Sequence, residues 1–181
     1  MLVIGLTGMP GAGKTEFVKL AQKRGFAVYR MGDAVWEWVK NRGLELTNDT
    51  VARIANEERK KYGGGIWAER TIEMIKKKAD KIIIDGIRSP DEIKIFKNYF
   101  HNFVLVAVHA PPEIRFKRIV GRERVDDAKS KNDFLARDKR ELGWGIGEVI
   151  RSADFLLVND CSLSDFRLEV EKLLNLNLHF A

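Results

Sequence analysis

The sequence has a single cysteine and no long apolar run. Cys161 has no second thiol to pair with, which excludes a framework of internal disulfides. No stretch approaches 18 consecutive uncharged apolar residues, so no transmembrane helix is expected. Residues 1–7 lead directly into an apolar segment without a preceding basic region, which is not the pattern of a signal peptide. These absences predict a cytoplasmic protein with no membrane partner.

The composition is that of one compact domain. Of 181 residues, 45% are hydrophobic and 32% are charged, which allows a sizeable core and argues against global disorder. No repeat and no Pro/Gly/Ser linker divides the chain, so a single domain over 1–181 is expected. The net charge of +6 excludes an acidic solvating protein. It permits contact with phosphate-rich partners, RNA included, without requiring it.

Short apolar runs alternate with stretches of helical period. The expected strands cover residues 2–7, 26–31, 81–85, 103–109 and 155–158. The expected helices cover residues 14–24, 33–42, 50–62, 66–78 and 90–99; others open at Pro111-Pro112 and at Ser162-x-x-Asp165, which resembles a capping box. This alternation predicts a three-layer, doubly wound α/β domain with about five parallel strands. In such sheets ligands bind beyond the carboxyl ends of the strands.

A glycine-rich phosphate loop follows the first expected strand. Its residues fit the pattern G-x-x-x-x-G-K-[ST]: Gly8, Met9, Pro10, Gly11, Ala12, Gly13, Lys14 and Thr15. Backbone N–H groups and the N-terminus of the following helix attract phosphate oxygens. Lys14 would reach the β- and γ-phosphates, and the Thr15 hydroxyl would ligate Mg²⁺. The loop predicts a nucleoside triphosphate, with ATP as the expected donor, and magnesium.

Other motifs separate the possible uses of this loop. The guanine-reading Asn-Lys-x-Asp and the transporter-type Ser-Gly-Gly-Gln are missing, and the chain is short for a motor ATPase. Phosphoryl transfer between two anionic substrates needs cations on both sides of the transferring group, and arginine suits this because its planar fork pairs two oxygens. Charged residues follow the later strands: Asp33, Asp85, Arg88, Arg118, Arg122, Arg124 and Arg137. The pattern favours a small-molecule kinase.

These segments, in this order, resemble the nucleoside monophosphate kinase superfamily along the whole chain. Residues 118–122 look like the start of an adenylate kinase lid, and residues 153–159 look like dephospho-coenzyme A kinase. Residues 85–89 and 145–150 make the chain similar to an archaeal family of adenylate kinase-related P-loop proteins. The resemblance implies a P-loop kinase fold with a helical acceptor region at about 34–80. It also implies a lid at about 121–141 that is far shorter than that of adenylate kinases.

The resemblance implies roles on the donor side. Arg118 would stack on the donor base, with Asn159 beside it. Asp85 would bind Mg²⁺ through water. Arg122 and Arg124 of the lid would clamp the phosphates when the lid closes.

The resemblance also implies roles on the acceptor side. Arg137, which belongs with the nucleotide-binding residues, would clamp the phosphates together with Arg122 and Arg124. Arg88 would hold the acceptor phosphate, in a segment one residue shorter than the adenylate kinase one. Asp33 would lie near the magnesium water shell or the acceptor. The acceptor region shows no adenosine-monophosphate signature, so the acceptor stays open.

Most of these residues also have a purely structural interpretation. Asp85 could be a structural hydrogen-bond acceptor at the end of its strand. Asp33 could be only a helix N-cap, and Arg88 could pair with Asp91 on the surface. Arg137 could pair with a carboxylate four residues before or after it. The charged stretch over 113–140 could be solvated surface.

Two functions are therefore open. The first is an ATP-dependent kinase acting on a phosphate or hydroxyl of a nucleotide or nucleotide-like small molecule. The alternative is an adenylate kinase-like slow ATPase that assists assembly of RNA or ribosomal complexes, although no RNA-binding motif is visible. The four tryptophans are expected mostly in the core, and one of them could be exposed in the acceptor cleft.

Overall fold

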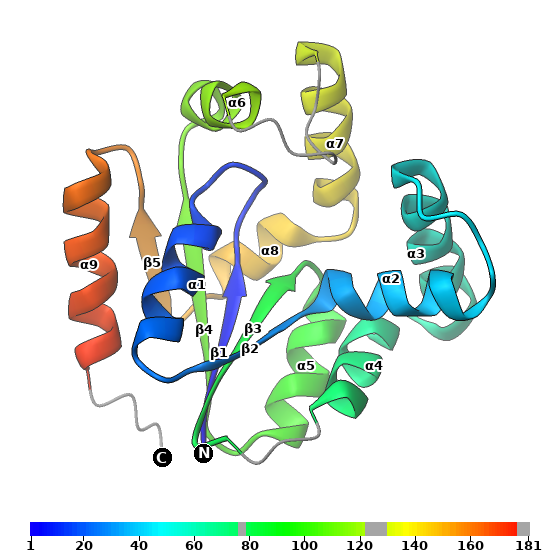
Figure 1. Cartoon of the computed structure of the whole chain (residues 1–181), viewed down its shortest axis with the longest axis horizontal. Helices are drawn as coiled ribbons and strands as arrows, with labels where there is room; N and C mark the ends of the chain where they lie inside the picture. The colour runs from blue at the N-terminus through cyan, green and yellow to red at the C-terminus, as the bar shows by residue number, and fades with distance from the viewer. Residues whose placement is uncertain (76–78, 122–129, 177–181) are drawn as a thin grey trace.

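The computed structural model describes residues 1–75, 79–121 and 130–176. Its centre is a sheet of five parallel strands in the order β2-β3-β1-β4-β5 (Figure 1). The strands are β1 Leu2–Thr7, β2 Ala27–Arg30, β3 Lys81–Ile87, β4 Phe103–His109 and β5 Phe155–Val158. Because all strands are parallel, all end at the same edge, as the alternating pattern predicts.

Helices connect and cover these strands. They are α1 Lys14–Lys23, α2 Met31–Asn41, α3 Asn48–Tyr62, α4 Ile66–Met74, α5 Pro90–Tyr99, α6 Pro112–Val120, α7 Lys131–Gly143, α8 Ile146–Arg151 and α9 Leu163–Asn175. Several predicted boundaries shift: β2 is shorter at both ends than the predicted 26–31, α3 begins two residues before the predicted 50, and α4 ends at Met74 and not at 78. α2 begins two residues earlier than predicted, directly where β2 ends at Arg30. β3 runs two residues past Asp85 to Ile87, across a register shift opposite Leu6 and Thr7.

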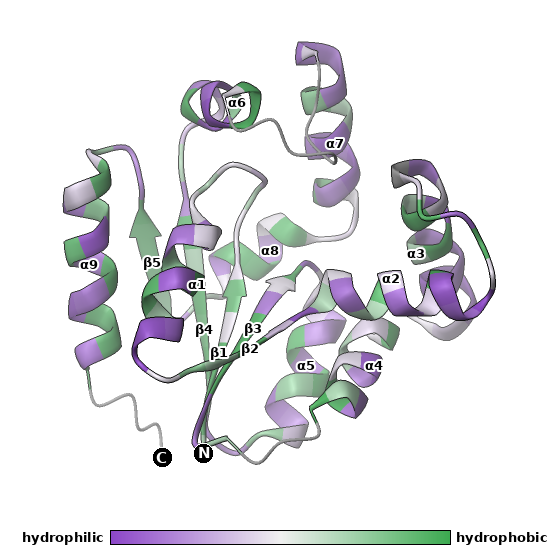
Figure 2. Cartoon of the chain, in the orientation of Figure 1, coloured by the Kyte–Doolittle hydropathy of each residue, from purple (hydrophilic) through white to green (hydrophobic). Residues whose placement is uncertain are grey.

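The two faces of the sheet are covered by different helices. Val3 and Ile4 are both fully buried on opposite faces, because successive side chains of a strand alternate. Ile4 belongs to a cluster with Phe17 of α1 and Phe166 of α9. Val3 belongs to a second cluster with residues of α4, α5 and α8. The result is the predicted three-layer domain, in which the strands are mainly hydrophobic and the helices show both kinds of residue (Figure 2).

Serine side chains define where several helices begin. Ser89 and Glu92 form a complete capping box at α5, which fixes the chain just after Arg88. At α9 Ser162 accepts a hydrogen bond from the Asp165 N–H at 3.2 Å, which is one half of the predicted box.

Helices on two sides extend past the carboxyl ends of the strands. In Figure 1, α6 and α7 lie above the strand tips, and α2 and α3 lie to the right of the sheet. The segment predicted as an acceptor region, 34–80, contains most of α2 and all of α3 and α4. The segment predicted as a lid, 121–141, includes most of α7, but positions 122–129 lie outside the described residues. No helix in the described part of the chain is long and apolar enough to cross a membrane.

Candidate active site

The loop between β1 and α1 has a backbone that requires glycine. Gly8 and Gly13 have φ angles of 139° and 119°, which residues with a side chain rarely adopt. A Cβ on Gly8 would lie 2.2 Å from the Val108 carbonyl oxygen, and a Cβ on Gly13 would lie 2.2 Å from Asn159 Nδ2. The predicted phosphate loop is therefore packed closely against β4 and against the chain after β5.

The Lys14 ammonium is turned back onto its own loop. It donates to the carbonyl oxygens of Gly8 and of Met9, the latter at 3.3 Å. Burial lowers the pKa of Lys14 from 10.5 to about 8, against the opposing attraction of Asp85 and Glu141. An anion at the loop would offset this desolvation and favour the charged lysine.

Asp85 lies across from the loop on the neighbouring strand. It is paired in register with Leu6 of β1 and with Arg30 of β2. Its Oδ1 atom is buried and has no hydrogen-bond partner among the described residues. Thr15 and Asp85 line the same cleft, and oxygen ligands are those that Mg²⁺ prefers. The orphaned carboxylate oxygen therefore fits a hydrated magnesium ion in contact with Thr15.

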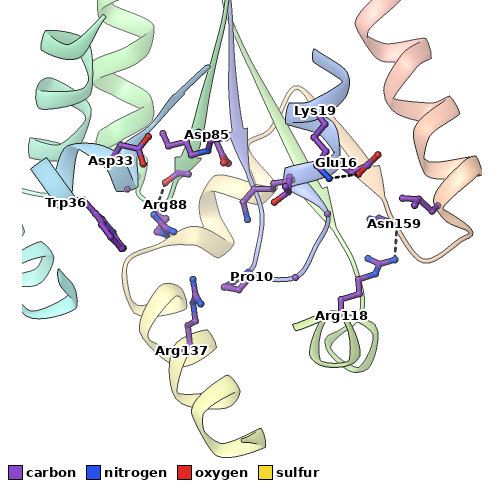
Figure 3. Close-up of a pocket in the computed structure, with 18 residues that line it drawn as sticks. Pro10, Glu16, Lys19, Asp33, Trp36, Asp85, Arg88, Arg118, Arg137 and Asn159 are labelled. Carbon is purple, nitrogen blue, oxygen red and sulfur yellow. Dashed lines mark hydrogen bonds and ion pairs between the residues drawn. The ribbon is translucent and has the colours of Figure 1, made fainter. Parts of the chain in front are cut away.

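One cleft of about 770 Å³ opens at the carboxyl ends of the strands (Figure 3). It brings together eleven of the residues predicted for the site: Pro10, Gly11, Gly13, Lys14, Thr15, Asp33, Asp85, Arg88, Arg118, Arg137 and Asn159. Gly8, Met9 and Ala12 belong to the same loop without lining the cleft. Arg122 and Arg124 lie outside the described residues.

Arg88 and Arg137 reach this cleft from two different elements and contact the same carboxylate. Arg88 follows β3, and its Nε lies 3.4 Å from Glu141 Oε2. Arg137 is on α7, and its Nε donates to Glu141 Oε1 at 3.3 Å. Pairing of Arg88 with Asp91 is not the arrangement found: Arg88 turns inward and away from the surface. The predicted pairing of Arg137 within its own helix is found, and the same side chain also lines the cleft.

The charges of Arg88, Arg137 and Glu141 stabilise one another. Burial alone would lower the pKa of Arg88, but Glu141, Glu92 and Asp85 raise it above its ordinary value. Burial would raise the pKa of Glu141, but Arg88, Arg137 and Lys14 hold it below its ordinary value. Both groups are therefore charged at neutral pH.

Arg118 and Asn159 form the opposite end of the cleft. Arg118 donates from Nη2 to Asn159 Oδ1 at 3.0 Å, and Asn159 Nδ2 donates to the Ala12 carbonyl at 2.8 Å. Asn159 itself is buried. The two side chains predicted for the donor base are thus joined to each other and to the phosphate loop.

Asp33 and Trp36 project from the first turns of α2 (Figure 3). The prediction that Asp33 could cap this helix is wrong, because α2 begins at Met31 and Arg30 is its N-cap. Partial burial raises the pKa of Asp33, with Asp85 and Glu37 adding to the effect and Arg30 opposing it. Trp36 is 46% exposed and lines the cleft, so it is the tryptophan predicted to be exposed there.

Three neighbours of the site are not identified by the sequence motifs. Glu141 joins the two arginines described above. Trp144 donates its indole N–H to Asn56 Oδ1 of α3 at 2.8 Å. Arg115 of α6 is buried and donates to the Pro10 carbonyl of the phosphate loop at 3.1 Å. No local motif marks them, because the contacts in question span 53 positions from Glu141 to Arg88, 88 from Trp144 to Asn56 and 105 from Arg115 to Pro10.

The sheet order, the phosphate loop and the flanking helices define a P-loop kinase-like domain. Residues 7–134 match the family described as an AAA domain. The UPF0200 protein of Thermoplasma acidophilum is 44% identical over 172 residues, covering 95% of this chain and 94% of that protein. The UPF0200 protein of Pyrococcus horikoshii is 39% identical over 179 residues, covering 96% of each chain. The chain belongs to the UPF0200 family.

Solved structures share the fold at low sequence identity. A Thermus thermophilus protein superposes with a TM-score of 0.67 at 21% identity, with 96% of each chain covered. Shikimate kinase from Bacteroides thetaiotaomicron superposes with a TM-score of 0.63 at 16% identity, covering 97% of this chain and 99% of that one. Shikimate kinase from Acinetobacter baumannii, solved with shikimate, gives 0.57 at 15% identity, covering 96% and 91%. These likenesses confirm the predicted fold class.

Proposed function

We propose that this protein is an ATP-dependent phosphotransferase acting on a nucleotide or nucleotide-like small molecule. One observation carries the proposal: one cleft is lined both by the phosphate loop and by two partly buried arginines, Arg88 after β3 and Arg137 on α7. A pure nucleotide-binding site needs cations for the triphosphate only. A transferase needs a second set for the acceptor and for the transferring group.

On the donor side, Lys14 would bind the β- and γ-phosphates of ATP. In doing so the Lys14 ammonium would exchange the carbonyl oxygens of Gly8 and Met9 for phosphate oxygens, which are charged partners. Thr15 would hold Mg²⁺ directly and Asp85 through water. The ion neutralises charge on the phosphates when bound. Arg118 and Asn159 would border the donor base.

On the acceptor side, Arg88 and Arg137 would bind an anionic group. The exposed ring of Trp36 offers a flat surface for a planar part of the acceptor. Asp33, whose pKa is raised by partial burial and by the nearby carboxylate of Asp85, would accept a hydrogen bond from an acceptor hydroxyl or from magnesium-bound water. Arg122 and Arg124 complete the proposed clamp on the strength of the family resemblance.

The test is a screen with Mg-ATP and a panel of nucleoside monophosphates, nucleosides and dephospho-coenzyme A. ADP release and phosphorylated products are followed by chromatography. A product formed in equal amount to ADP from one acceptor, and lost in Lys14→Ala with the circular dichroism spectrum unchanged, is the expected result.

The opposite outcome is equally specific. ADP release without any phosphorylated product contradicts the proposal and supports the slow ATPase with an RNA or ribosomal partner. In that case RNA binding with a steep salt dependence would be the next observation to seek, given the net charge of +6.

A further inference from the structure

Arg30 is a cation of the cleft that none of the sequence motifs includes. It is the last residue of β2, it is exposed, and it lines the same cleft as the phosphate loop. Arg88 and Arg118 line the cleft too, but their guanidinium groups donate to a carbonyl and to an amide oxygen of the protein. Among the residues that the structure describes, Arg30 has no ion pair and no side-chain hydrogen bond. Its guanidinium group is therefore available to a ligand.

The sheet places Arg30 on the far side of Asp85 from the phosphate loop. Arg30 is paired in register with Asp85 of β3, and Asp85 is paired with Leu6 of β1, just before the loop. Val28, two residues before Arg30, packs against the cluster that contains Phe17 of α1, so Arg30 projects from this same face of the sheet. Two strand spacings separate its backbone from β1 by roughly 10 Å. Arg30 therefore belongs to the outer wall of the cleft.

Local helix chemistry gives no reason for an arginine at this position. Arg30 is the N-cap of α2 and makes no capping hydrogen bond, because a guanidinium group has donors only. Serine, threonine, aspartate and asparagine are preferred there, since they accept from the first N–H groups of a helix. A cation at this end is also repelled by the helix dipole, although Asp33 in the first turn offsets part of the repulsion. An anion bound to Arg30 would offset the rest.

Two side chains of α2 share the outer wall with Arg30. Asp33 and Trp36 both line the cleft (Figure 3). Burial raises the pKa of Asp33, and the charge of Arg30 is the main effect that opposes the rise, so the two groups are near each other without forming an ion pair. The ring of Trp36 is exposed beside them. The wall therefore combines a cation, a hydrogen-bond acceptor and a flat apolar surface.

We infer that Arg30 is a specificity-determining residue that binds an anionic group of the acceptor, a phosphate or a carboxylate, at the outer wall of the cleft. The inference rests on the proposed function, because it takes the occupant of this wall to be the acceptor. The planar guanidinium fork suits either kind of oxyanion. Because Arg88 follows β3 and Arg30 ends β2, the acceptor class is a small molecule with an anionic group beyond the one assigned to Arg88.

Binding of inorganic phosphate tests this without turnover. The protein is saturated with MgADP to fill the phosphate loop, and phosphate is titrated while ¹H–¹⁵N signals of cleft residues are followed. The backbone of Gly32 and the indole of Trp36 report on the outer wall, and the backbone of Gly86 reports on the neighbourhood of Arg88. A parallel titration with acetate distinguishes a carboxylate site from a phosphate site.

Arg30→Gln is expected to weaken the binding of the preferred anion about tenfold at Gly32 and Trp36, and to change it less than about twofold at Gly86. Unchanged binding at Gly32 and Trp36 would overturn the inference. Equal weakening at all three signals would overturn it too, because Arg30 and Arg88 would then serve one common site.

A different role for Arg30 would be only to keep Asp33 ionised. Arg30→Gln would then raise the pKa of Asp33, measured by ¹³C titration of its carboxyl group, and leave anion binding as it was. That result would reject the inference. The matched control is Arg151→Gln, an exposed arginine at the end of α8 that does not line the cleft and undergoes the same change of charge. It is expected to bind like the unmodified protein.

A second variant separates ligand binding from a structural role. Arg30→Ser supplies a hydroxyl that can cap α2, so it should raise the midpoint of urea unfolding while weakening anion binding about tenfold. A protein that is less stable and binds the anion normally would assign Arg30 to the fold and overturn the inference.

Kinetics distinguish this inference from the proposed function. With a phosphorylated acceptor in hand, Arg30→Gln should raise KM for that acceptor about tenfold and change KM for ATP less than about threefold. A protein that phosphorylates nothing, yet shows the expected loss of anion binding at Gly32 and Trp36, retains the inference as a binding property and rejects the kinase. Full turnover with unchanged acceptor KM in Arg30→Gln rejects the inference alone.

Discussion

Arg115 of α6 forms a two-pronged ion pair with Asp138 of α7. Its Nη1 lies 3.0 Å from Oδ1, its Nη2 lies 2.5 Å from Oδ2, and its Nη1 also donates to the Pro10 carbonyl. Both side chains are largely buried. One guanidinium group thereby fastens the helix that carries Arg137 to the phosphate loop.

Breaking the ion pair between Arg115 and Asp138 should destabilise both α7 and the phosphate loop. Asp138→Asn leaves the charge of Arg115 buried and unpaired, so we expect the free energy of unfolding to fall by about 3 kcal/mol. ATP should bind less tightly, because the pair also holds Pro10 in place. Urea unfolding and calorimetric titration measure the two effects. Glu113→Gln, at an exposed position of α6, is the control, and an equal loss in both variants would contradict this account.

ATP binding should depend on pH through Lys14. In the free protein the pKa of Lys14 is about 8, so half of the ammonium is neutral at that pH. Only the charged form attracts phosphate, so affinity for ATP should decrease as the pH rises through 8. Bound phosphates favour the charged form, so binding near pH 8 should take up a proton. Calorimetry in buffers of different ionisation heats measures this uptake.

The control for this prediction is Lys14→Arg. Arginine stays charged throughout the range, so its complex should form without the proton uptake near pH 8. If uptake of the same size persists in Lys14→Arg, another group is responsible.

Gly13 should not tolerate a methyl group. Its φ of 119° and the 2.2 Å approach to Asn159 Nδ2 mean that Gly13→Ala strains the backbone and displaces Asn159. We expect a loss of about 1–3 kcal/mol in stability and loss of measurable ATP binding. Gly143→Ala is the control, since a Cβ there meets nothing within 4 Å. Comparable behaviour of the two variants would be incompatible with a strained loop.

Trp36 should affect the acceptor and not ATP. Trp36→Leu removes an exposed ring on the wall of the cleft, and loss of stacking should raise the KM for a planar acceptor about tenfold. The KM for ATP should stay nearly constant, because Trp36 comes from α2 and not from the phosphate loop. Tyr99→Leu, an exposed aromatic of α5 outside the cleft, is the comparison. A parallel rise of both KM values would show that Trp36 acts on the whole cleft.

The fold and the phosphate loop are predictable because their signals are local. Alternating runs of apolar residues place all five strands, and an eight-residue pattern places the loop. The end of β2 is less predictable, because the strand ends at Arg30 and the helix begins at Met31, and neither residue at this junction is a glycine or proline. Helix α2 therefore starts before Asp33. Asp33 lies in the first turn of α2 and faces the cleft instead of capping the helix.

Charge pairing across the chain is the part that sequence patterns miss. Arg115 and Asp138 are 23 positions apart, and Arg88 and Glu141 are 53 apart. In the sequence all four are charged residues among many others, since Asp, Glu, Lys and Arg make up 32% of the chain. Only the packing of α6 and α7 over the strand ends selects which opposite charges meet.

The strand order β2-β3-β1-β4-β5 has a consequence for how this protein could acquire new chemistry. The phosphate loop leaves the middle strand, which is held by neighbours on both sides, whereas Asp33 and Trp36 lie on α2 beside the edge strand β2. Substitutions along α2 can therefore reshape the outer wall while the loop and its glycines stay untouched. Under the proposed function, the triphosphate-binding loop is on the central strand and acceptor recognition is on a helix beside an edge strand, so relatives with this core could diverge in the acceptor without any change in the loop.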